Sequence, residues 1–102
     1  MSTMRNSVML IGYPTQPIMD SERNEASFKL SVTEYNKGCQ NTHVFDCIGK
    51  ERLAQRIVAN VKEGKEIAID GSLRNNDYED GLGQCHTYTW IVVNDLFIIG
   101  KD

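Results

Sequence analysis

One stretch of the sequence, residues 49–64, decides the fold; it reads GKERLAQRIVANVKEG. Its apolar residues recur at the spacing of a helix face and are Leu53, Ile57 and Val61, flanked by Ala54 and Val58. Charged and polar residues fill the other positions, which is typical of an amphipathic α-helix with one face in a core. We therefore expect a helix of about three turns over residues 50–61, ended by Gly64.

Sequence patterns typical of β-strands lie on both sides of this helix. Over residues 28–33, apolar residues alternate with polar ones, which is the period of a half-buried strand. The other expected strands are apolar runs bounded by turn residues, and they cover residues 7–11, 42–48, 67–78 and 86–99. We expect residues 20–25 to form a polar loop, and three aromatic residues to lie in the core: Phe28, Phe45 and Phe97.

This order of elements predicts the fold class. Three strands, one helix and two further strands make an all-β protein with one helix, in the order β-β-β-α-β-β. That is the arrangement of the OB-fold, a five-stranded barrel. The 102 residues suit a single OB-fold domain over 1–102 and are too few for a Rossmann domain or a (β/α)8 barrel.

The charge of the chain argues against a general binder of polyanions. Eleven Lys and Arg stand against 14 Asp and Glu, which gives a formal net charge of −3, whereas phosphate binding depends on basic residues. The distribution is uneven, however: residues 50–65 carry five basic and two acidic side chains, and residues 71–84 carry one basic and three acidic. We therefore expect stacking to contribute more to any nucleic-acid affinity than phosphate contacts do.

The cysteines indicate a reducing compartment rather than disulfides or a metal site. Cys39, Cys47 and Cys85 contain no CxxC pair, and an odd number cannot pair completely within one chain. Cys39, His43 and Cys47 follow one another at intervals of four, which in a strand separates neighbours by about 13 Å, too far for one zinc ion. We therefore expect free thiols, no metal, no cofactor and a cytoplasmic location.

Two further classes of protein are not expected. No window approaches the roughly 20 apolar residues of a membrane helix, and the first residues lack the apolar run of a signal peptide. There is also no phosphate loop and no paired acid and base in the sequence, so we do not expect an enzyme.

The chain resembles the bacterial single-stranded DNA-binding protein family over residues 6–100. Six pieces of the family's pattern occur in the same order, beginning with Asn6, Val8, Leu10 and Gly12, followed by Pro17. The later pieces are Phe28, Leu30 and Glu34; then His43, Gly49 and Lys50; then Gly64, Ile67, Ile69, Gly71, Leu73 and Arg74; and last Asp80, Gly83, Gln84, Thr89, Val92 and Val93. The resemblance implies an OB-fold homotetramer, or a dimer, that binds single-stranded DNA without sequence preference in replication, recombination and repair.

The resemblance also implies which residues contact DNA. Tyr78 lies where the family has a stacking Trp, and Tyr35 lies one position before the family's second-strand aromatic, which a small bulge would realign. The expected DNA contacts are Tyr78, Arg74, Lys50, Tyr35, Trp90 and Arg5, with Trp90 alternatively at a subunit interface. The expected oligomer interface contains His43, Asn6 and Val8.

Departures from the family pattern leave alternatives open. Thr42 and Ile48 replace family aromatics, and Asn76 and Asp77 replace basic residues. We also expect no acidic tail of the kind that recruits replication proteins in relatives. These changes favour weaker DNA binding than is typical of the family. The alternatives are a PriB-type primosomal replication protein and an OB-fold protein-interaction module with little DNA binding.

Overall fold

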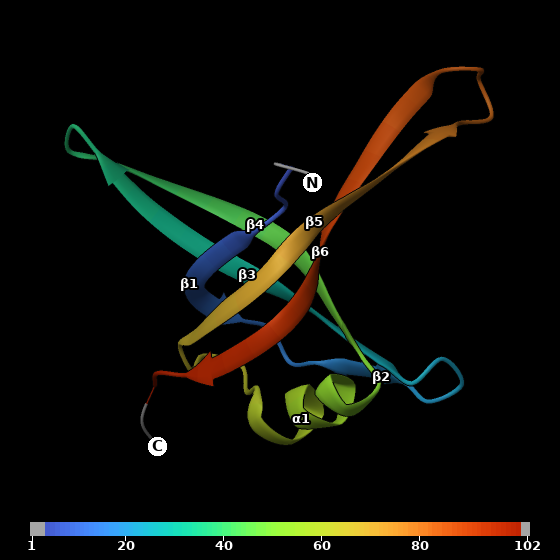
Figure 1. Cartoon of the computed structure of the whole chain (residues 1–102). Helices are drawn as coiled ribbons and strands as arrows, with labels where there is room; N and C mark the ends of the chain where they lie inside the picture. Colours follow the sequence, from blue (N-terminus) through green and yellow to red (C-terminus); the bar gives the residue numbers. More distant parts are fainter. Residues whose placement is uncertain (1–3, 101–102) are drawn as a thin grey trace.

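The computed structural model describes residues 4–100, and these form six strands and one helix (Figure 1). In chain order they are β1 (Val8–Pro14), β2 (Ile18–Asp20), β3 (Glu25–Asn36), β4 (Cys39–Lys50), α1 (Arg52–Asn60), β5 (Ile67–Glu79) and β6 (Cys85–Ile98). The ends of the expected domain, residues 1–3 and 101–102, lie outside the described residues. The expected strands and helix are all present in the expected order.

The long strands close into a barrel, as the OB-fold prediction requires. Neighbours in the sheet follow the order β1-β5-β6-β4-β3-β2, and β1 also pairs with β3 through Tyr13 and Pro14. Strands β4 and β6 run parallel, with Cys47 beside Ile91. Strand β2 is the element that the sequence did not predict; it pairs with the start of β3, and its last residue lies in the expected loop.

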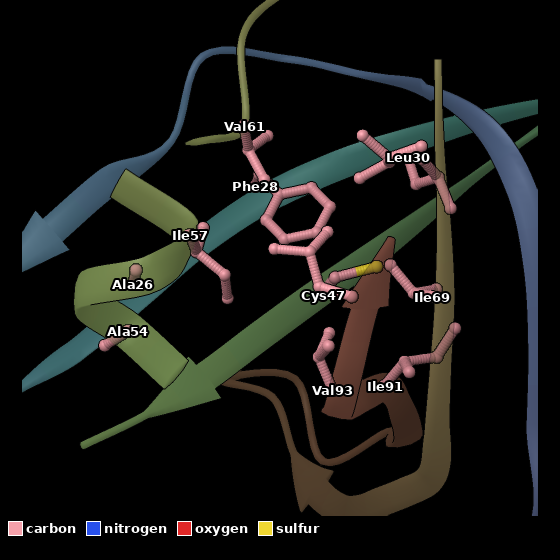
Figure 2. Close-up of a cluster of buried hydrophobic side chains, with 12 residues drawn as sticks. Ala26, Phe28, Leu30, Cys47, Ala54, Ile57, Val61, Ile69, Ile91 and Val93 are labelled. Atoms are coloured by element: carbon pink, nitrogen blue, oxygen red, sulfur yellow. The ribbon is translucent and has the colours of Figure 1, made fainter. Parts of the chain in front are cut away.

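Helix α1 covers one end of this barrel (Figure 1). Ala54 and Ile57 are fully buried on its inner face and contact a core drawn from the strands. Figure 2 shows the apolar side chains of this core pointing toward one another: Ala26, Phe28, Leu30, Cys47, Ala54, Ile57, Val61, Ile69, Ile91 and Val93. Burying one Leu or Ile side chain stabilises a protein by about 1.5–3 kcal/mol, so this cluster holds helix and barrel together.

The helix is shorter than predicted. It begins at Arg52 because Glu51 has a φ of 59°, outside the helical range, and it ends at Asn60 because Val61 is extended at a φ of −79° and a ψ of 125°. The expectation that Gly64 ends the helix is therefore wrong. Val58 was expected on the buried face but is 44% exposed.

The phenylalanines divide between core and surface. Phe28 is 4% exposed and Phe45 packs against the core while remaining half-buried. Phe97, which was expected in the core, is 50% exposed. It pairs with Ala68 on the outer face of the sheet. The alternation of inward and outward residues along β6 explains its position, because its neighbour Leu96 points inward and is buried.

The β3–β4 and β5–β6 hairpins extend past the barrel as separate arms (Figure 1). The first arm turns at Lys37 and Gly38, which have φ values of 52° and 80°. The second turns through residues 80–84, where the Asp80 N–H donates to the Gln84 carbonyl over 2.9 Å. Both turns fall in gaps between the strands that the sequence predicts, the first between residues 33 and 42 and the second between residues 78 and 86.

Candidate nucleic-acid interface

A groove of about 860 Å³ lies over the face of β3 and β4 that points away from the core. The segment between β1 and β2 borders it on one side, and the base of the β5–β6 arm borders it on the other. Its lining includes Thr15, Gln16, Arg23, Glu25, Ser27, Lys29, Asp46, Ile48, Lys50, Glu63, Asn76, Tyr88 and Trp90. In OB-folds, this face with its flanking loops is where oligonucleotides bind.

Strand register places the aromatic residues of the second arm on one face. In an antiparallel pair, directly opposite residues point to the same side of the sheet. Three such pairs follow one another along the arm, and they are Arg74 with Trp90, Asn76 with Tyr88, and Tyr78 with His86. Because Asn76, Tyr88 and Trp90 line the groove, this aromatic face continues from the groove toward the tip of the arm.

Tyr88 and Trp90 form a stacked pair at the groove. Their ring centroids are 5.5 Å apart and their planes differ by 20°. The Tyr88 hydroxyl donates a hydrogen bond to Asp46 Oδ2 over 2.7 Å, across the boundary between β6 and β4. This hydrogen bond, more than partial burial, raises the pKa of Tyr88 above its ordinary value. The pair thus offers a fixed aromatic surface at neutral pH.

Basic side chains lie beside this surface, and carboxylates partly balance them. Lys29 Nζ is 3.6 Å from Asp46 Oδ1, and Lys50 Nζ is 3.8 Å from Glu25 Oε1. Arg74 Nη1 donates to the Ser72 hydroxyl over 2.9 Å. Both lysine side chains remain mostly exposed, at 64% and 58%. A polyanion can therefore reach these lysines. The net positive charge of the surface that it meets is lower than the number of cations suggests.

Two acidic residues of the second arm point away from the aromatic face. Asp77 and Glu79 alternate with Tyr78 along β5, and Asp77 pairs with Thr87 on the opposite side of the arm. The Thr87 hydroxyl donates to Asp77 Oδ1 over 2.7 Å. The charges of Asp77 and Glu79 are therefore separated from the Tyr78 ring by the thickness of the sheet, whereas Asp80 contacts His86 on the side of the ring.

The predicted DNA contacts occupy different parts of this surface. Lys50 and Trp90 line the groove, and Arg74 lies opposite Trp90 on the neighbouring strand. Tyr78 lies further out on the same face and is 51% exposed. The sequence did not predict Lys29, Asp46, Tyr88 or His86 as site residues, although the alternation of β6 places Tyr88 and His86 on the side of Trp90.

Two predicted contacts lie away from the groove. Tyr35 is 75% exposed near the tip of the β3–β4 arm. The prediction that a bulge realigns Tyr35 is wrong, because the β3–β4 register is continuous from Glu25 opposite Lys50 to Asn36 opposite Cys39. Arg5 is exposed and precedes β1.

The predicted interface residues have roles within the chain. Asn6 Nδ2 donates to the Leu73 carbonyl, and Asn6 Oδ1 accepts from the Leu73 N–H, each over 2.8 Å, which ties the segment before β1 to β5. Val8 packs against the core. His43 is exposed opposite Val32, with its ring centroid 6.4 Å from that of Phe45.

Metal-ligating clusters and membrane-spanning helices are both absent from the described part of the chain. Between residues 4 and 100, no group of three or more His, Cys, Asp or Glu side chains could hold a metal ion. Over the same residues, no helix has the length and apolar character needed to cross a membrane.

Comparison with known proteins assigns this barrel to a family. The single-strand binding protein family matches residues 5–99. The chain belongs to this family. A single-stranded DNA-binding protein of Caldanaerobacter subterraneus is 28% identical over 100 residues, a match that covers 91% of this chain and 67% of that protein.

Solved structures of single-strand binding proteins share the fold. The small single-stranded DNA-binding protein of Streptomyces coelicolor superposes with a TM-score of 0.75 at 19% identity, over 94% of this chain and 96% of that one. The Plasmodium falciparum SSB in complex with single-stranded DNA superposes with a TM-score of 0.78 at 20% identity, over 96% and 97%. At these identities the likeness concerns the fold, and it agrees with the OB-fold prediction.

Proposed function

We propose that this chain binds single-stranded DNA without sequence preference, in DNA replication, recombination or repair. The observation that carries this proposal is the groove lined by the stacked Tyr88 and Trp90 rings and by Lys29 and Lys50, with Arg74 opposite Trp90 on the neighbouring strand. Aromatic rings accept any base because every base has a π-face, and cations follow the phosphates. Membership of the single-strand binding protein family supports the same function.

Stacking supplies most of the affinity in this proposal. The groove lysines are paired with carboxylates, so binding an oligonucleotide displaces existing ion pairs and gains less from each phosphate. The logarithm of the binding constant should therefore fall with the logarithm of salt concentration with a slope of only a few ions. Each stacked base should contribute about 1–3 kcal/mol.

Titration of fluorescein-labelled oligo(dT) with the protein tests this proposal. Trp90 is the only tryptophan of the chain, so its emission reports on the groove directly. We expect micromolar or tighter binding at low salt, with quenching of Trp90, and weaker binding to a duplex of the same length. An absence of binding at low salt would contradict the proposal and favour the protein-interaction module.

The same proposal covers assembly and location. We infer that the chain forms a homo-oligomer, either a tetramer or a dimer, and light scattering after gel filtration measures which. Met9 and Ile11 support this inference, because they are 69% and 51% exposed on the outer face of β1. We further propose a binding protein without catalytic activity in a reducing, cytoplasmic environment, for which the free thiols of Cys39, Cys47 and Cys85 are the supporting feature.

A further inference from the structure

A hydrogen-bonded histidine lies against the exposed Tyr78 ring near the tip of the β5–β6 arm. The Tyr78 and His86 ring centroids are 5.3 Å apart and their planes differ by 27°, a stacked arrangement. His86 Nε2 lies 2.6 Å from Asp80 Oδ2. One face of the phenol ring thus packs against the imidazole in an offset stack, while Tyr78 remains 51% exposed.

The turn of the arm holds Asp80 in place. Its second carboxylate oxygen, Oδ1, accepts hydrogen bonds from the backbone N–H groups of Leu82 and Gln84, over 2.8 and 3.0 Å. The imidazole contact is the largest of the influences that lower the pKa of Asp80, and these two backbone hydrogen bonds follow it. The carboxylate therefore connects the backbone of the turn to the imidazole.

We propose that His86, held by Asp80, is a positioning residue that fixes the ring of Tyr78 for stacking on a DNA base. The inference rests on the proposed function and deepens it at one residue. A DNA strand that follows the aromatic face outward from Trp90 and Tyr88 reaches Tyr78 next, and its base stacks on the face of Tyr78 that the imidazole leaves open. His86 acts on DNA only through Tyr78.

The physical advantage is preorganisation. A free tyrosine on an exposed arm samples several rotamers, and binding a base restricts it to one, which lowers affinity. The imidazole confines the ring before DNA arrives, so less freedom is lost on binding. The interaction free energy of an aromatic pair corresponds to a change in affinity of about 2-fold to 10-fold. We expect His86→Ala to weaken oligo(dT) binding by about that factor.

A double-mutant cycle tests this role. The oligo(dT) affinities of the wild type, His86→Ala, Tyr78→Ala and the double variant are measured under the same conditions, with circular dichroism to establish that each variant is folded. If His86 acts through Tyr78, His86→Ala weakens binding in the wild type and has no effect in the Tyr78→Ala background. An equal loss in both backgrounds, or no loss in either, overturns the inference.

Matched aspartate variants separate positioning from charge. Asp80→Asn retains an oxygen for the backbone N–H groups of the turn but replaces the oxygen that faces His86, and Asp77→Asn removes one charge from the opposite face of the same arm. Both substitutions reduce the repulsion of phosphates, so we expect Asp77→Asn to bind oligo(dT) as tightly as the wild type or slightly more tightly. Asp80→Asn also releases His86, so we expect it to bind oligo(dT) several-fold more weakly than Asp77→Asn. Equal affinities of these variants contradict the inference.

Nuclear Overhauser contacts between the Tyr78 and His86 rings provide a readout without DNA. We expect these contacts in the wild type, and we expect Asp80→Asn to weaken them. Absent contacts in the wild type overturn the inference. If the wild type does not bind oligo(dT), both the proposed function and this inference are contradicted. If the wild type binds but His86 and Tyr78 show no coupling, only the inference is overturned.

Discussion

The hydroxyl of Tyr88 donates a hydrogen bond to Asp46 Oδ2 over 2.7 Å and so joins the strands that close the barrel in parallel. The same tyrosine stacks on Trp90, so one side chain contributes both to barrel closure and to the aromatic surface of the groove.

Tyr88→Phe should separate these contributions, because it removes the hydroxyl and keeps the ring. Tyr88 is 47% exposed, so we expect the free energy of unfolding to fall by only about 0.5–1 kcal/mol. Urea unfolding followed by Trp90 emission measures this change. Oligo(dT) affinity should fall less for Tyr88→Phe than for Tyr88→Ala, and equal losses for the two variants would contradict a stacking role of the ring.

The exposed tyrosines of the arms should differ in their effect on DNA binding. Tyr78→Ala removes a ring from the aromatic face that continues from the groove, and we expect it to weaken oligo(dT) binding by about 1–3 kcal/mol. Tyr35→Ala is the matched control, because Tyr35 is also an exposed arm residue but lies away from the groove, and we expect little change. Fluorescence anisotropy measures both; a larger loss for Tyr35 than for Tyr78 would place the DNA on the other arm.

Gly12 allows two strands of the barrel to approach closely. A Cβ atom at this position would overlap the backbone carbonyl oxygen of Ser31, which cannot move without disturbing its strand. We expect Gly12→Ala to lower the free energy of unfolding by about 1–3 kcal/mol, measured by urea denaturation. Gly81→Ala is the control, since a Cβ atom at Gly81 would meet no other atom within 4 Å; comparable losses at both sites would contradict the close-approach explanation.

The thiols should differ in reactivity. Burial is the main cause that raises the pKa of Cys47 to about 12, and the nearby charge of Asp46 adds to it. The reactive thiolate is therefore scarce at neutral pH, whereas Cys39 and Cys85 are exposed. We expect Ellman's reagent to modify Cys39 and Cys85 rapidly in the native protein and Cys47 only on unfolding. Rapid modification of all of them without denaturant would show that the barrel opens readily.

Acid should weaken the contact between helix α1 and strand β6. The backbone N–H of Leu96 and the Arg56 guanidinium both donate to Asp95, and they lower the pKa of its carboxyl below the ordinary value. The unfolded chain therefore takes up this proton at a higher pH than the folded chain does. The contribution of Asp95 is complete above its ordinary pKa and is lost as pH falls through the lower folded value.

Unfolding midpoints in urea at pH 6 and at pH 3 measure this loss, with Asp95→Asn as the comparison. We expect the variant to lose less stability between the two pH values than the wild type loses. Equal losses would mean that other carboxylates account for the acid sensitivity.

The sequence predicted the barrel because its signals are local. The helical spacing of Leu53, Ile57 and Val61, the alternation over residues 28–33 and the apolar runs of the other strands are all patterns of neighbouring residues. Strand β2 has no such signal, since its three residues are all exposed and pair only at an edge. The surface position of Phe97 could not be predicted either, because Phe97 lies in an uninterrupted apolar run that shows no alternation.

The candidate site was only partly predictable for the same reason. Alternation places Trp90 and Tyr88 on one side of β6. It also places Asp77 and Tyr78 on opposite faces of the arm, which the net charge of residues 71–84 does not reveal. The contact between Tyr88 and Asp46 depends on the parallel pairing of β4 with β6, and no local pattern specifies that pairing.

The parallel pairing of β4 with β6 also bears on how the chain folds. The β3–β4 and β5–β6 hairpins join residues close in sequence, so their ladders can form early with little loss of chain entropy. Cys47 and Ile91 are separated in sequence by the helix and by most of the second arm. We therefore expect their pairing to form only after both hairpins have formed. Barrel closure should therefore limit the folding rate and place this small domain among slow, high-contact-order folders.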